Sequence, residues 1–421
     1  MPEVTLAVAG AGLRGTIYAR RAHATGTAVV AVAEPDPVRR ARFAAEFGIA
    51  PARTFADWRD LAGIGRIADG IVIATQDSEH AEPAVRFAGL GYHILLEKPM
   101  APDEADSVRI VEAVEHAGTM LAVCHVLRYM PYTRKLRELV GQGRIGEPIS
   151  IQHLEPIGWW HYAHSYVRGN WRRTDTSGPM LLTKSCHDID WISYVMGETP
   201  VRVSSFGRRS HFRAEQRPAG ATDRCVSCPV EPDCPYSAPR LYLSCLGDPR
   251  REAWPLGAVT HDVTRAGVLA ALADGPYGRC VYASDNDVVD HQVVNLEFGS
   301  GRTGSFTVTA FTPLAQRQTR LFGTHGAIEG DGRRLTVHDF VSGQVETIET
   351  AGADEELHGH GGGDEALTDA FVSAIATGDP SLLGSDARHA LAGHRVVWAA
   401  EQARRTGTVV DIAPTTPRKG D

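Results

Sequence analysis

A stretch in the middle of the chain, LLTKSCHDIDWISYVMG at residues 181–197, combines an apolar helical pattern with several proton-transfer side chains. The spacing of its leucine, isoleucine and valine residues predicts a buried amphipathic helix. On that helix Thr183 and Lys184 share the face of His187, because residues three and four apart are neighbours. A lysine beside an imidazole lowers the imidazole pKa, so His187 is a candidate general base and Lys184 a candidate catalytic partner. The alternative is a core histidine beside a lysine that reaches outward to solvent.

A second set of candidate residues lies in GAGLRG, residues 10–15, directly after the apolar run VTLAVA. Glycines at this spacing permit a tight turn, a close approach of the backbone to a pyrophosphate, and a helix N-terminus aimed at its charge. Because a strand, a helix and βαβ units surround it, the stretch predicts a dinucleotide site rather than a structural turn. The cofactor-binding candidates in this stretch are Gly10, Gly12, Leu13, Arg14 and Gly15.

Glu34 ends the second predicted strand, about 20 residues after the glycine turn. A carboxylate at that place can accept hydrogen bonds from a ribose diol and repels an additional phosphate. We therefore expect NAD rather than NADP as the cofactor. Arg39 and Arg40 follow closely and keep NADP open as the alternative.

The motif LLEKPMA, residues 95–101, places Glu97 and Lys98 at the end of the fourth predicted strand. In an open α/β sheet the ligand crevice lies beyond the carboxyl ends of the strands, so we expect Lys98 near a nicotinamide. Its ammonium can polarise an oxygen and stabilise a developing alkoxide; the alternative is a solvated lysine paired with Glu97. Thr75 ends the predicted strand GIVIAT and His80 follows it. Both are cofactor-side candidates, although His80 could instead hold a helix start.

Aromatic residues and arginines crowd the segment IGWWHYAHSYVRGNWRR at residues 157–173, just before the candidate catalytic helix. Aromatic faces stack on sugar C–H surfaces, and arginine binds carboxylate, sulfonate or phosphate groups bidentately. The segment predicts a polar substrate and allows an anionic one; an oligomer interface enriched in the same residue types is the alternative. The candidate substrate-binding residues, here and elsewhere, are Arg128, Tyr129, Arg168, Trp171, Arg172, Thr183 and Tyr282.

Four cysteines recur in RCVSCPVEPDCPYSAPRLYLSC with the spacing C-x2-C-x5-C-x10-C. Four thiolates could form a closed structural zinc site that stabilises a segment without a core of its own. The spacing after the first pair is irregular for a zinc knuckle and matches no common iron–sulfur pattern, so free or redox-labile thiols and an iron–sulfur site stay open. The candidate metal ligands are Cys225, Cys228, Cys234 and Cys245.

The elements that must position these residues change character near residue 125. Before it, short apolar runs alternate with helical patterns, which indicates βαβ units and a parallel sheet covered on both faces. From residue 149, longer and partly alternating strands with Gly and Asp turns indicate a mainly antiparallel sheet. We expect an α/β protein with a Rossmann dinucleotide-binding domain at 1–125 and a C-terminal α/β domain with a large open sheet at 126–421, which includes a Cys- and Pro-rich insertion at about 217–256 and helices from about 364.

The overall composition narrows the class of protein. The chain has 421 residues, a formal net charge of -8 and a pI of about 6.1. An acidic balance argues against a nucleic-acid partner, because phosphate affinity requires basic surface. No apolar run approaches the ~20 residues of a membrane span and the first residues show no signal peptide, so we expect no membrane association and a cytoplasmic location. Seven cysteines favour reduced thiols or a metal site over a disulfide framework.

Several motifs, in their order along the chain, resemble the Gfo/Idh/MocA oxidoreductase family over nearly the full chain. They are EKP, CHVLRYMP at 124–131, GRIGEP at 143–148, HDID, LFGTHGAI at 321–328 and the final DARHALAGHRVVWAAEQARRTG. The helix motif KSCHD and the segment YASDNDVVDHQ at 282–292 resemble a cysteine-bearing branch of that family.

This resemblance implies nicotinamide use, sugar, sugar-acid or cyclitol substrates, and a homodimer or homotetramer that associates through the second sheet. It also implies that His187 and Lys98 handle the substrate proton. The aspartate that the family carries four residues before the histidine is replaced here by Thr183.

Three functions are compatible with these motifs. The first is an NAD-dependent dehydrogenase of a sugar, sugar acid or cyclitol. The second is an NAD-dependent glycoside hydrolase, an offshoot of the family in which transient oxidation permits elimination of the aglycone before the hydride is returned. The third is a catalytically silent sensor or scaffold. Net NADH accumulation, bond cleavage without net cofactor consumption, and indifference to His187→Ala distinguish the three.

Overall fold

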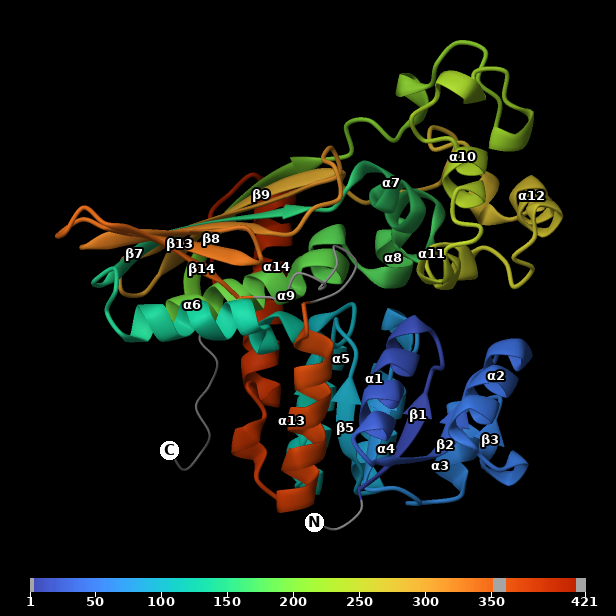
Figure 1. The fold of residues 1–421 in the computed structure, drawn as a ribbon, viewed down its shortest axis with the longest axis horizontal. Coiled ribbons are helices and arrows are strands. Elements are labelled where there is room, and N and C mark those ends of the chain that lie inside the picture. Colours follow the sequence, from blue (N-terminus) through green and yellow to red (C-terminus); the bar gives the residue numbers. More distant parts are fainter. Residues whose placement is uncertain (1–3, 351–360, 414–421) are drawn as a thin grey trace.

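The computed structural model describes residues 4–350 and 361–413, which form two sheets with helices around them (Figure 1). The N-terminal sheet has six parallel strands in the order β3-β2-β1-β4-β5-β6. They are β1 (Thr5–Ala9), β2 (Ala28–Ala33), β3 (Thr54–Phe55), β4 (Gly70–Ile73), β5 (His93–Leu96) and β6 (Leu121–Val123). The strand order reverses between β1 and β4, which is the point where doubly wound sheets bind ligands.

Helices cover both faces of this sheet because its strands are apolar on both sides; β4, GIVI, is buried at every position. Polar side chains begin several of the helices. Asp103, for example, accepts a hydrogen bond from the Asp106 amide at the start of α5. The covering helices are α1 (Leu13–Ala24), α2 (Pro37–Phe47), α3 (Trp58–Gly63), α4 (Ala81–Gly89) and α5 (Glu104–Ala117). The predicted Rossmann architecture is confirmed.

The second sheet has nine strands in the order β14-β13-β12-β11-β7-β10-β9-β8-β15. Neighbouring strands are antiparallel except β7 and β10, which run parallel. The strands are β7 (Pro148–Pro156), β8 (Pro200–Arg208), β9 (His291–Phe298), β10 (Thr303–Thr309), β11 (Gln318–Gly323), β12 (Gly326–Gly330), β13 (Arg334–Asp339), β14 (Val345–Glu349) and β15 (Val410–Asp411). The predicted open, mostly antiparallel sheet is therefore confirmed.

Two helices, α6 (Pro131–Gly141) and α9 (Met180–Met196), lie between this sheet and the N-terminal domain (Figure 1). α9 is the helix predicted from residues 181–197. Nearly all of its side chains are buried, and they share one hydrophobic core with the inner face of the sheet. Between β7 and α9 the aromatic segment forms short helical turns, including α7 (Trp159–Tyr162) and α8 (Thr174–Ser177).

The last two described helices, α13 (Gly363–Thr377) and α14 (Ala387–Thr406), were grouped with the second domain in the sequence analysis. In the structure α13 packs on α1, and its Phe371 belongs to the same core as β1. The first half of α14 packs into the N-terminal core through Leu391, whereas its second half packs under the nine-stranded sheet through Val397. The chain thus returns to the Rossmann domain after completing the second one.

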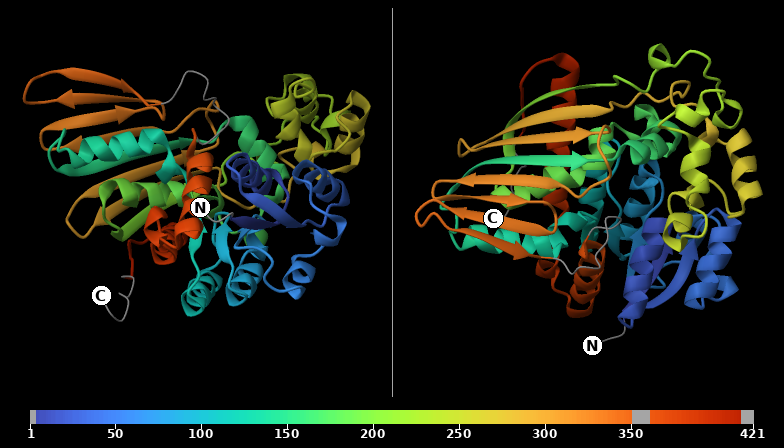
Figure 2. Two further views of the ribbon diagram at one scale, coloured as in Figure 1. Left: turned by 60° about the horizontal axis from the view of Figure 1, so that its bottom comes forward. Right: turned by 45° about the horizontal axis from the view of Figure 1, so that its top comes forward.

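The insertion between β8 and β9 is larger and more regular than the loop expected at about 217–256. It contains three short helices, α10 (Ala238–Leu243), α11 (Pro249–Ala253) and α12 (Arg265–Asp274), and a small core of its own. Apolar residues in VLAALA allow α12 to pack there, a pattern outside the predicted bounds. Both views in Figure 2 show the insertion beside the N-terminal domain, and His261 lies 3.1 Å from Asp36 at the start of α2.

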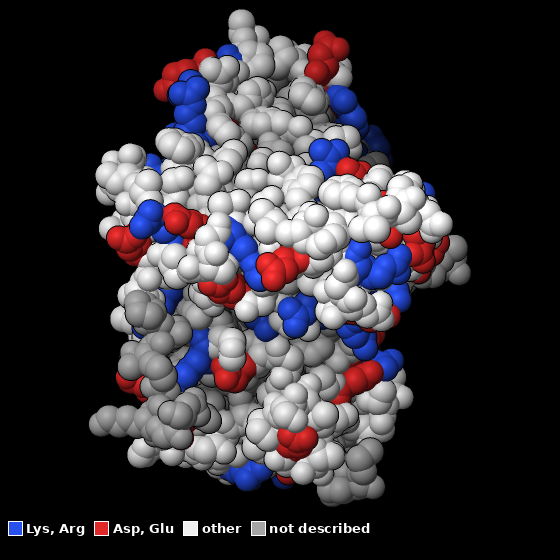
Figure 3. Space-filling model, turned by 90° about the vertical axis from the view of Figure 1, so that its left-hand side faces the viewer, with Lys and Arg blue, Asp and Glu red and all other residues white. Residues whose placement is uncertain are grey.

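The surface and the helices show two further properties. On the face drawn in Figure 3, Lys and Arg are interspersed with Asp and Glu and no large area carries a single sign. Among residues 4–350 and 361–413, no helix is both long enough and apolar enough to span a membrane.

Candidate active site

The glycine turn between β1 and α1 leaves no room for a side chain at Gly10 or Gly15, whereas a Cβ on Gly12 would meet no atom within 4 Å. Gly10 has a φ of +92°, and a Cβ added there would lie 2.4 Å from the carbonyl oxygen of Ala74 on the neighbouring β4 segment. A Cβ on Gly15 would lie 2.0 Å from the Gly10 carbonyl oxygen. The turn therefore packs directly against the end of β4. No side chain caps the first amides of α1, which begins at Leu13. A backbone cradle of this shape fits a pyrophosphate.

Glu34 lies buried at the end of β2, beside this turn. Its carboxylate accepts hydrogen bonds from the backbone amides of Ala11 and Asp36, each at 2.9 Å. The Arg39 guanidinium lies 3.2 Å from the same carboxylate and is nearly half exposed. Glu34 thus lies at the place from which a carboxylate can contact the ribose of a dinucleotide bound at this turn, with the Arg39 cation at its side.

Arg14 and Glu97 form an ion pair that is largely buried, so neither side chain stands free at the surface. The Arg14 Nε donates to Glu97 at 2.6 Å, and its Nη1 donates to Asp364 on α13 at 3.1 Å. Burial acts against ionisation of Glu97, but Arg14 and Lys98 outweigh it and lower the pKa of that carboxyl. The ion pairs of Arg14 with Glu97 and with Asp364 therefore hold α1, the end of β5 and α13 together.

Lys98 reaches across from the N-terminal domain to the first turn of α9. Its ammonium donates to the backbone carbonyl of Thr183 at 2.5 Å and lies 5.9 Å from the centre of the Trp171 ring. The Trp171 indole in turn donates to Asp77, in the segment after β4, at 2.8 Å. The structure thus brings together Lys98, Thr183 and Trp171, three of the candidates that lie far apart in sequence.

The turn that carries Lys98 is held from two sides. The His80 ring lies 2.7 Å from the Pro99 carbonyl oxygen through Nδ1 and 3.3 Å from the Thr75 carbonyl oxygen through Nε2. From α14, the His394 Nε2 accepts the Met100 amide at 3.0 Å. His80 and Thr75 therefore position the Lys98 turn through buried contacts.

His187 lies one helical turn beyond Thr183, on the same face of α9, so the Cα atoms of the two residues are about 6 Å apart along the helix axis. Its Nε2 lies 2.8 Å from the Nη2 of Arg317, in the segment between β10 and β11. Because a guanidinium can only donate, this Nε2 is the accepting, unprotonated nitrogen. Arg317 also donates to the buried Asp188. Burial opposes ionisation of Asp188, but Arg317 and His187 hold its pKa well below the usual range.

Lys184 faces a carboxylate on β7. Its ammonium lies 3.0 Å from Glu155, and the other oxygen of that carboxylate lies 2.9 Å from Arg317. Burial lowers the pKa of Lys184, and Glu155 opposes that shift. The cation in contact with the His187 imidazole is therefore Arg317, and Lys184 is its neighbour across Glu155.

Arg317, Glu155 and Asp77 were absent from the sequence-based candidates. Glu155 stands at the end of a predicted strand, PISIQHLEP, where a ligand-facing residue could have been suspected. Arg317 stands in TPLAQRQT, which has no motif, and its partners lie 129 and 130 residues earlier in the chain. Only the fold brings it to His187.

Arg128 and Tyr129 follow β6, as expected, but their polar groups are engaged within the protein. Arg128 forms a double ion pair with Asp190 of α9, with both contacts at 2.6 Å. The Tyr129 hydroxyl accepts the Gly384 amide at 2.9 Å, and burial raises the pKa of this tyrosine to about 12. Both residues tie the end of β6 to neighbouring elements.

The other three substrate candidates lie around the insertion. Arg168 is 1% exposed and donates to the backbone carbonyls of Arg279 and Tyr236. Arg172 pairs with Asp285 at 2.8 Å. The Tyr282 hydroxyl lies 3.1 Å from the His211 ring. The structure does not bring these three side chains together with Lys98 and His187.

Three of the four candidate metal ligands lie together and the fourth lies apart. Cys225, Cys228 and Cys234 line one small cavity, whereas Cys245 does not line it and donates instead to the Leu241 carbonyl. As the side chains stand, no group of three or more His, Cys, Asp or Glu in residues 4–350 and 361–413 could hold a metal ion. The same cavity is lined by a fourth thiol, that of Cys280.

Two known proteins with similar sequences act on sugars or cyclitols. The chain is 30% identical over 224 residues to inositol 2-dehydrogenase 4 of Saccharopolyspora erythraea, which covers 52% of this chain and 61% of that protein. It is 28% identical over 142 residues to 2,7-anhydro-N-acetylneuraminate hydratase of Escherichia coli, which covers 34% of this chain and 37% of that protein.

Solved structures match over almost the full length. Levoglucosan dehydrogenase in complex with NADH and L-sorbose superposes with a TM-score of 0.73 at 18% identity, and covers 98% of this chain and 100% of that one. Residues 4–125 match the model of an oxidoreductase family described as an NAD-binding Rossmann fold, and residues 137–412 match that family's C-terminal alpha/beta domain. The chain therefore belongs to the Gfo/Idh/MocA oxidoreductase family and is an enzyme of that type, with the family's NAD-binding Rossmann domain at residues 4–125.

Proposed function

We propose that the protein transfers a hydride between NAD and a carbinol carbon of a sugar, sugar acid or cyclitol. The observation that carries the proposal is the contact of the Lys98 ammonium with the Thr183 carbonyl. It holds a cation from the nicotinamide side of the fold one helical turn from the His187 imidazole. The inositol and levoglucosan dehydrogenases among its relatives support a polyol substrate.

The residues of the chain have separate tasks in this proposal. The glycine turn and Glu34 bind the cofactor, which when bound supplies the hydride acceptor. Lys98 donates a hydrogen bond to the substrate hydroxyl and stabilises the alkoxide charge that develops there. His187 accepts the hydroxyl proton, and Trp171 offers a ring face to the sugar.

The substrate class follows from the charges beside His187. Arg317 donates to Nε2, the nitrogen that has to accept the proton, so a productive substrate must draw the guanidinium away. A carboxylate or another anionic substituent can do so, because it competes for the same fork of donors. We therefore favour an acidic sugar over a neutral one. Arg317→Gln should raise the KM for sugar acids by at least about tenfold, which is a loss of about 1.4 kcal/mol, and leave the KM for neutral polyols little changed.

The choice of NAD over NADP rests on Glu34. Its buried carboxylate would repel a ribose phosphate, while Arg39 weakens that repulsion. Glu34→Ala should narrow the ratio of kcat/KM values for NAD and NADP, and Arg39→Ala should widen it. The two matched variants must move the ratio in opposite directions; movement in the same direction would contradict the assignment.

The test of catalysis compares two histidines. His187→Gln should abolish NADH formation with a panel of acidic and neutral sugars, while cofactor binding, followed by calorimetry, is unchanged. His389→Gln, at an exposed position of α14, serves as the matched control and should retain full activity. Activity that survives in His187→Gln would remove the proposed base and leave the silent scaffold as the better description.

A redox-neutral activity is the second candidate. Thr183 stands where the family carries an aspartate, so the residues available for proton transfer beside His187 differ from those of the family. In addition, the relative from Escherichia coli is named as a hydratase. An NAD-dependent glycoside hydrolase predicts aglycone release without net NADH accumulation. The same substrate panel, followed simultaneously for NADH and for released aglycone, separates the two activities.

We also propose a homodimer or homotetramer that associates through the nine-stranded sheet, in the cytoplasm. The sheet exposes large apolar side chains, among them Ile149, Val201 and Phe206, the last 65% exposed. Such side chains on one sheet favour burial against another copy. Phe206→Asp should lower the molar mass measured by light scattering, whereas Val38→Asp, at an exposed position of α2, should not.

A further inference from the structure

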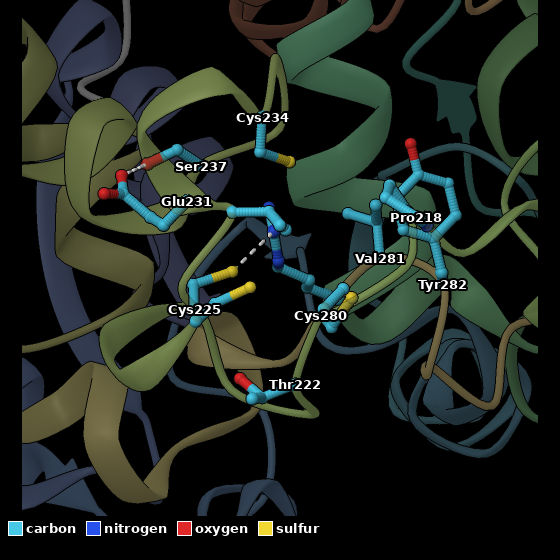
Figure 4. Close-up of a pocket in the computed structure, with 13 residues that line it drawn as sticks. Pro218, Thr222, Cys225, Glu231, Cys234, Ser237, Cys280, Val281 and Tyr282 are labelled. Carbon is cyan, nitrogen blue, oxygen red and sulfur yellow. Dashed lines mark hydrogen bonds between the residues drawn. The ribbon is translucent and has the colours of Figure 1, made fainter.

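Four cysteines line one small cavity at the base of the insertion. The cavity has a volume of about 20 Å³ and is lined by Cys225, Cys228, Cys234 and Cys280 together with Arg168. Figure 4 shows the labelled Cys225, Cys234 and Cys280 around the same space. A volume of this size holds about one water-sized occupant, which matches a single ion.

The fourth cysteine reaches the cavity through backbone pairing. An isolated antiparallel bridge joins Arg224 to Arg279, and the Cys280 amide donates to the Asp223 carbonyl at 2.9 Å. This bridge places Cys225 and Cys280 next to each other although 55 positions separate them in the sequence. Cys245, eleven residues after Cys234, packs into the core of the insertion and does not line the cavity.

A buried cation faces these thiols. The Arg168 Nη2 lies 3.5 Å from the Cys225 sulfur, and Nη1 has no hydrogen-bond partner. Among the described residues no carboxylate pairs with Arg168, although its side chain is almost completely buried. A buried guanidinium without a counter-charge is unfavourable unless a nearby group carries negative charge. Thiolates are the groups in position to carry it.

Backbone amides also point at three of the sulfurs. In each case the amide is that of the residue two positions after the cysteine: Val230 for Cys228, Tyr236 for Cys234 and Tyr282 for Cys280. Burial nevertheless raises the pKa of Cys234 and of Cys280, whereas the pKa of the less buried Cys228 is lowered. Hydrogen bonds to a sulfur stabilise its charged form and are the usual outer contacts of metal-bound thiolates. Three separate turns therefore present a cysteine in the same way.

We propose that Cys225, Cys228, Cys234 and Cys280 bind one structural zinc ion as thiolates, with Arg168 as the buried counter-cation. The four thiols release four protons, and the resulting dianion is partly balanced by the guanidinium. Side-chain rotation must close the sulfurs on the ion, because they do not yet form a coordination shell. A closed set of four thiolates is the arrangement of structural zinc sites, in which no position is open for chemistry. The ion would join the insertion to the segment that leads into β9.

The experiment measures metal content in the full chain, purified under reducing conditions from cells supplied with zinc. We expect about one zinc per chain in the native protein and in Cys245→Ser. In Cys280→Ser zinc affinity should fall by more than the roughly 10–100-fold that loss of an outer contact costs. If Cys280→Ser does not fold, titration of native thiols with a mercurial should release zinc in step with modification. Zinc-free protein with reduced thiols, bound iron with visible absorption, or equal loss of zinc in both variants would each overturn the assignment.

Discussion

Asp190→Asn removes one charge from the ion pair that ties α9 to the segment after β6. The Asp190 and Arg128 side chains are 1% and 8% exposed, and both contacts between them measure 2.6 Å. In the variant the guanidinium keeps the Gly384 carbonyl as a partner but loses its counter-charge in a buried place. Breaking a buried pair from one side costs about 3–5 kcal/mol, so we expect a loss of that size in the free energy of unfolding.

The assay is urea unfolding followed by tryptophan fluorescence, to which Trp191, next to Asp190 on α9, contributes as one of the seven tryptophans of the chain. Circular dichroism should give the same transition if the chain unfolds in one step. Glu46→Gln is the matched control: Arg20 contacts Glu46 with two nitrogens as well, at 2.5 and 2.9 Å, but their side chains are 61% and 31% exposed. An exposed pair contributes about 0–1 kcal/mol.

The pH dependence gives the result that would refute the reasoning. Burial opposes ionisation of Asp190, but His125 and Arg128 hold its pKa below the usual value. The pair therefore stabilises the fold above about pH 4, and this stability is lost as the pH falls through the lowered pKa. The difference in the free energy of unfolding between the native protein and Asp190→Asn should be largest at neutral pH and should decrease in acid. If Asp190→Asn lowers the free energy of unfolding by no more than Glu46→Gln does, or by the same amount at every pH, then burial does not determine how much the Asp190–Arg128 pair contributes to stability.

Two further substitutions have expected outcomes. Gly10→Ala forces a Cβ to within 2.4 Å of the Ala74 carbonyl at a φ of +92°, so we expect a loss of about 1–3 kcal/mol and of NAD binding, measured by thermal unfolding with and without NAD. Asp386 begins α14, where it accepts the His389 amide. Asp386→Ala should cost about 1 kcal/mol at pH 5. The His389 contact lowers the pKa of Asp386 to about 2, so the cost should disappear as the pH falls from about 4 to 2.

Much of the fold could be predicted because local patterns and tertiary packing agree. The glycine turn, the apolar strand GIVI and the EKP motif each require the same neighbours that the structure supplies. The position of Lys98 followed from a general rule about the carboxyl ends of strands. The helix at 181–197 was predicted from its apolar spacing, and its polar residues proved to face partners from four other parts of the chain.

The parts that sequence reasoning missed depend on partners far away in the chain. Arg168 lies three residues before Trp171, yet the first points into the insertion and the second toward Lys98. Neighbours in a sequence with irregular helical turns do not share a direction, so proximity to the catalytic helix was misleading for Arg168. Cys280 was missed for a related reason, since the bridge that brings it to Cys225 consists of a single residue pair.

The double membership of α14 restricts how the protein can be divided. Its first half fills the core of one domain and its second half the core of the other, and α13 completes the face around α1. A fragment that ends near residue 125 would leave that face bare, so the dinucleotide-binding part is not a free-standing module. If the connection after β6 were cleaved, α14 would still join the two domains, because it packs in both cores. Movement of one domain relative to the other is therefore limited by how far this one helix can bend.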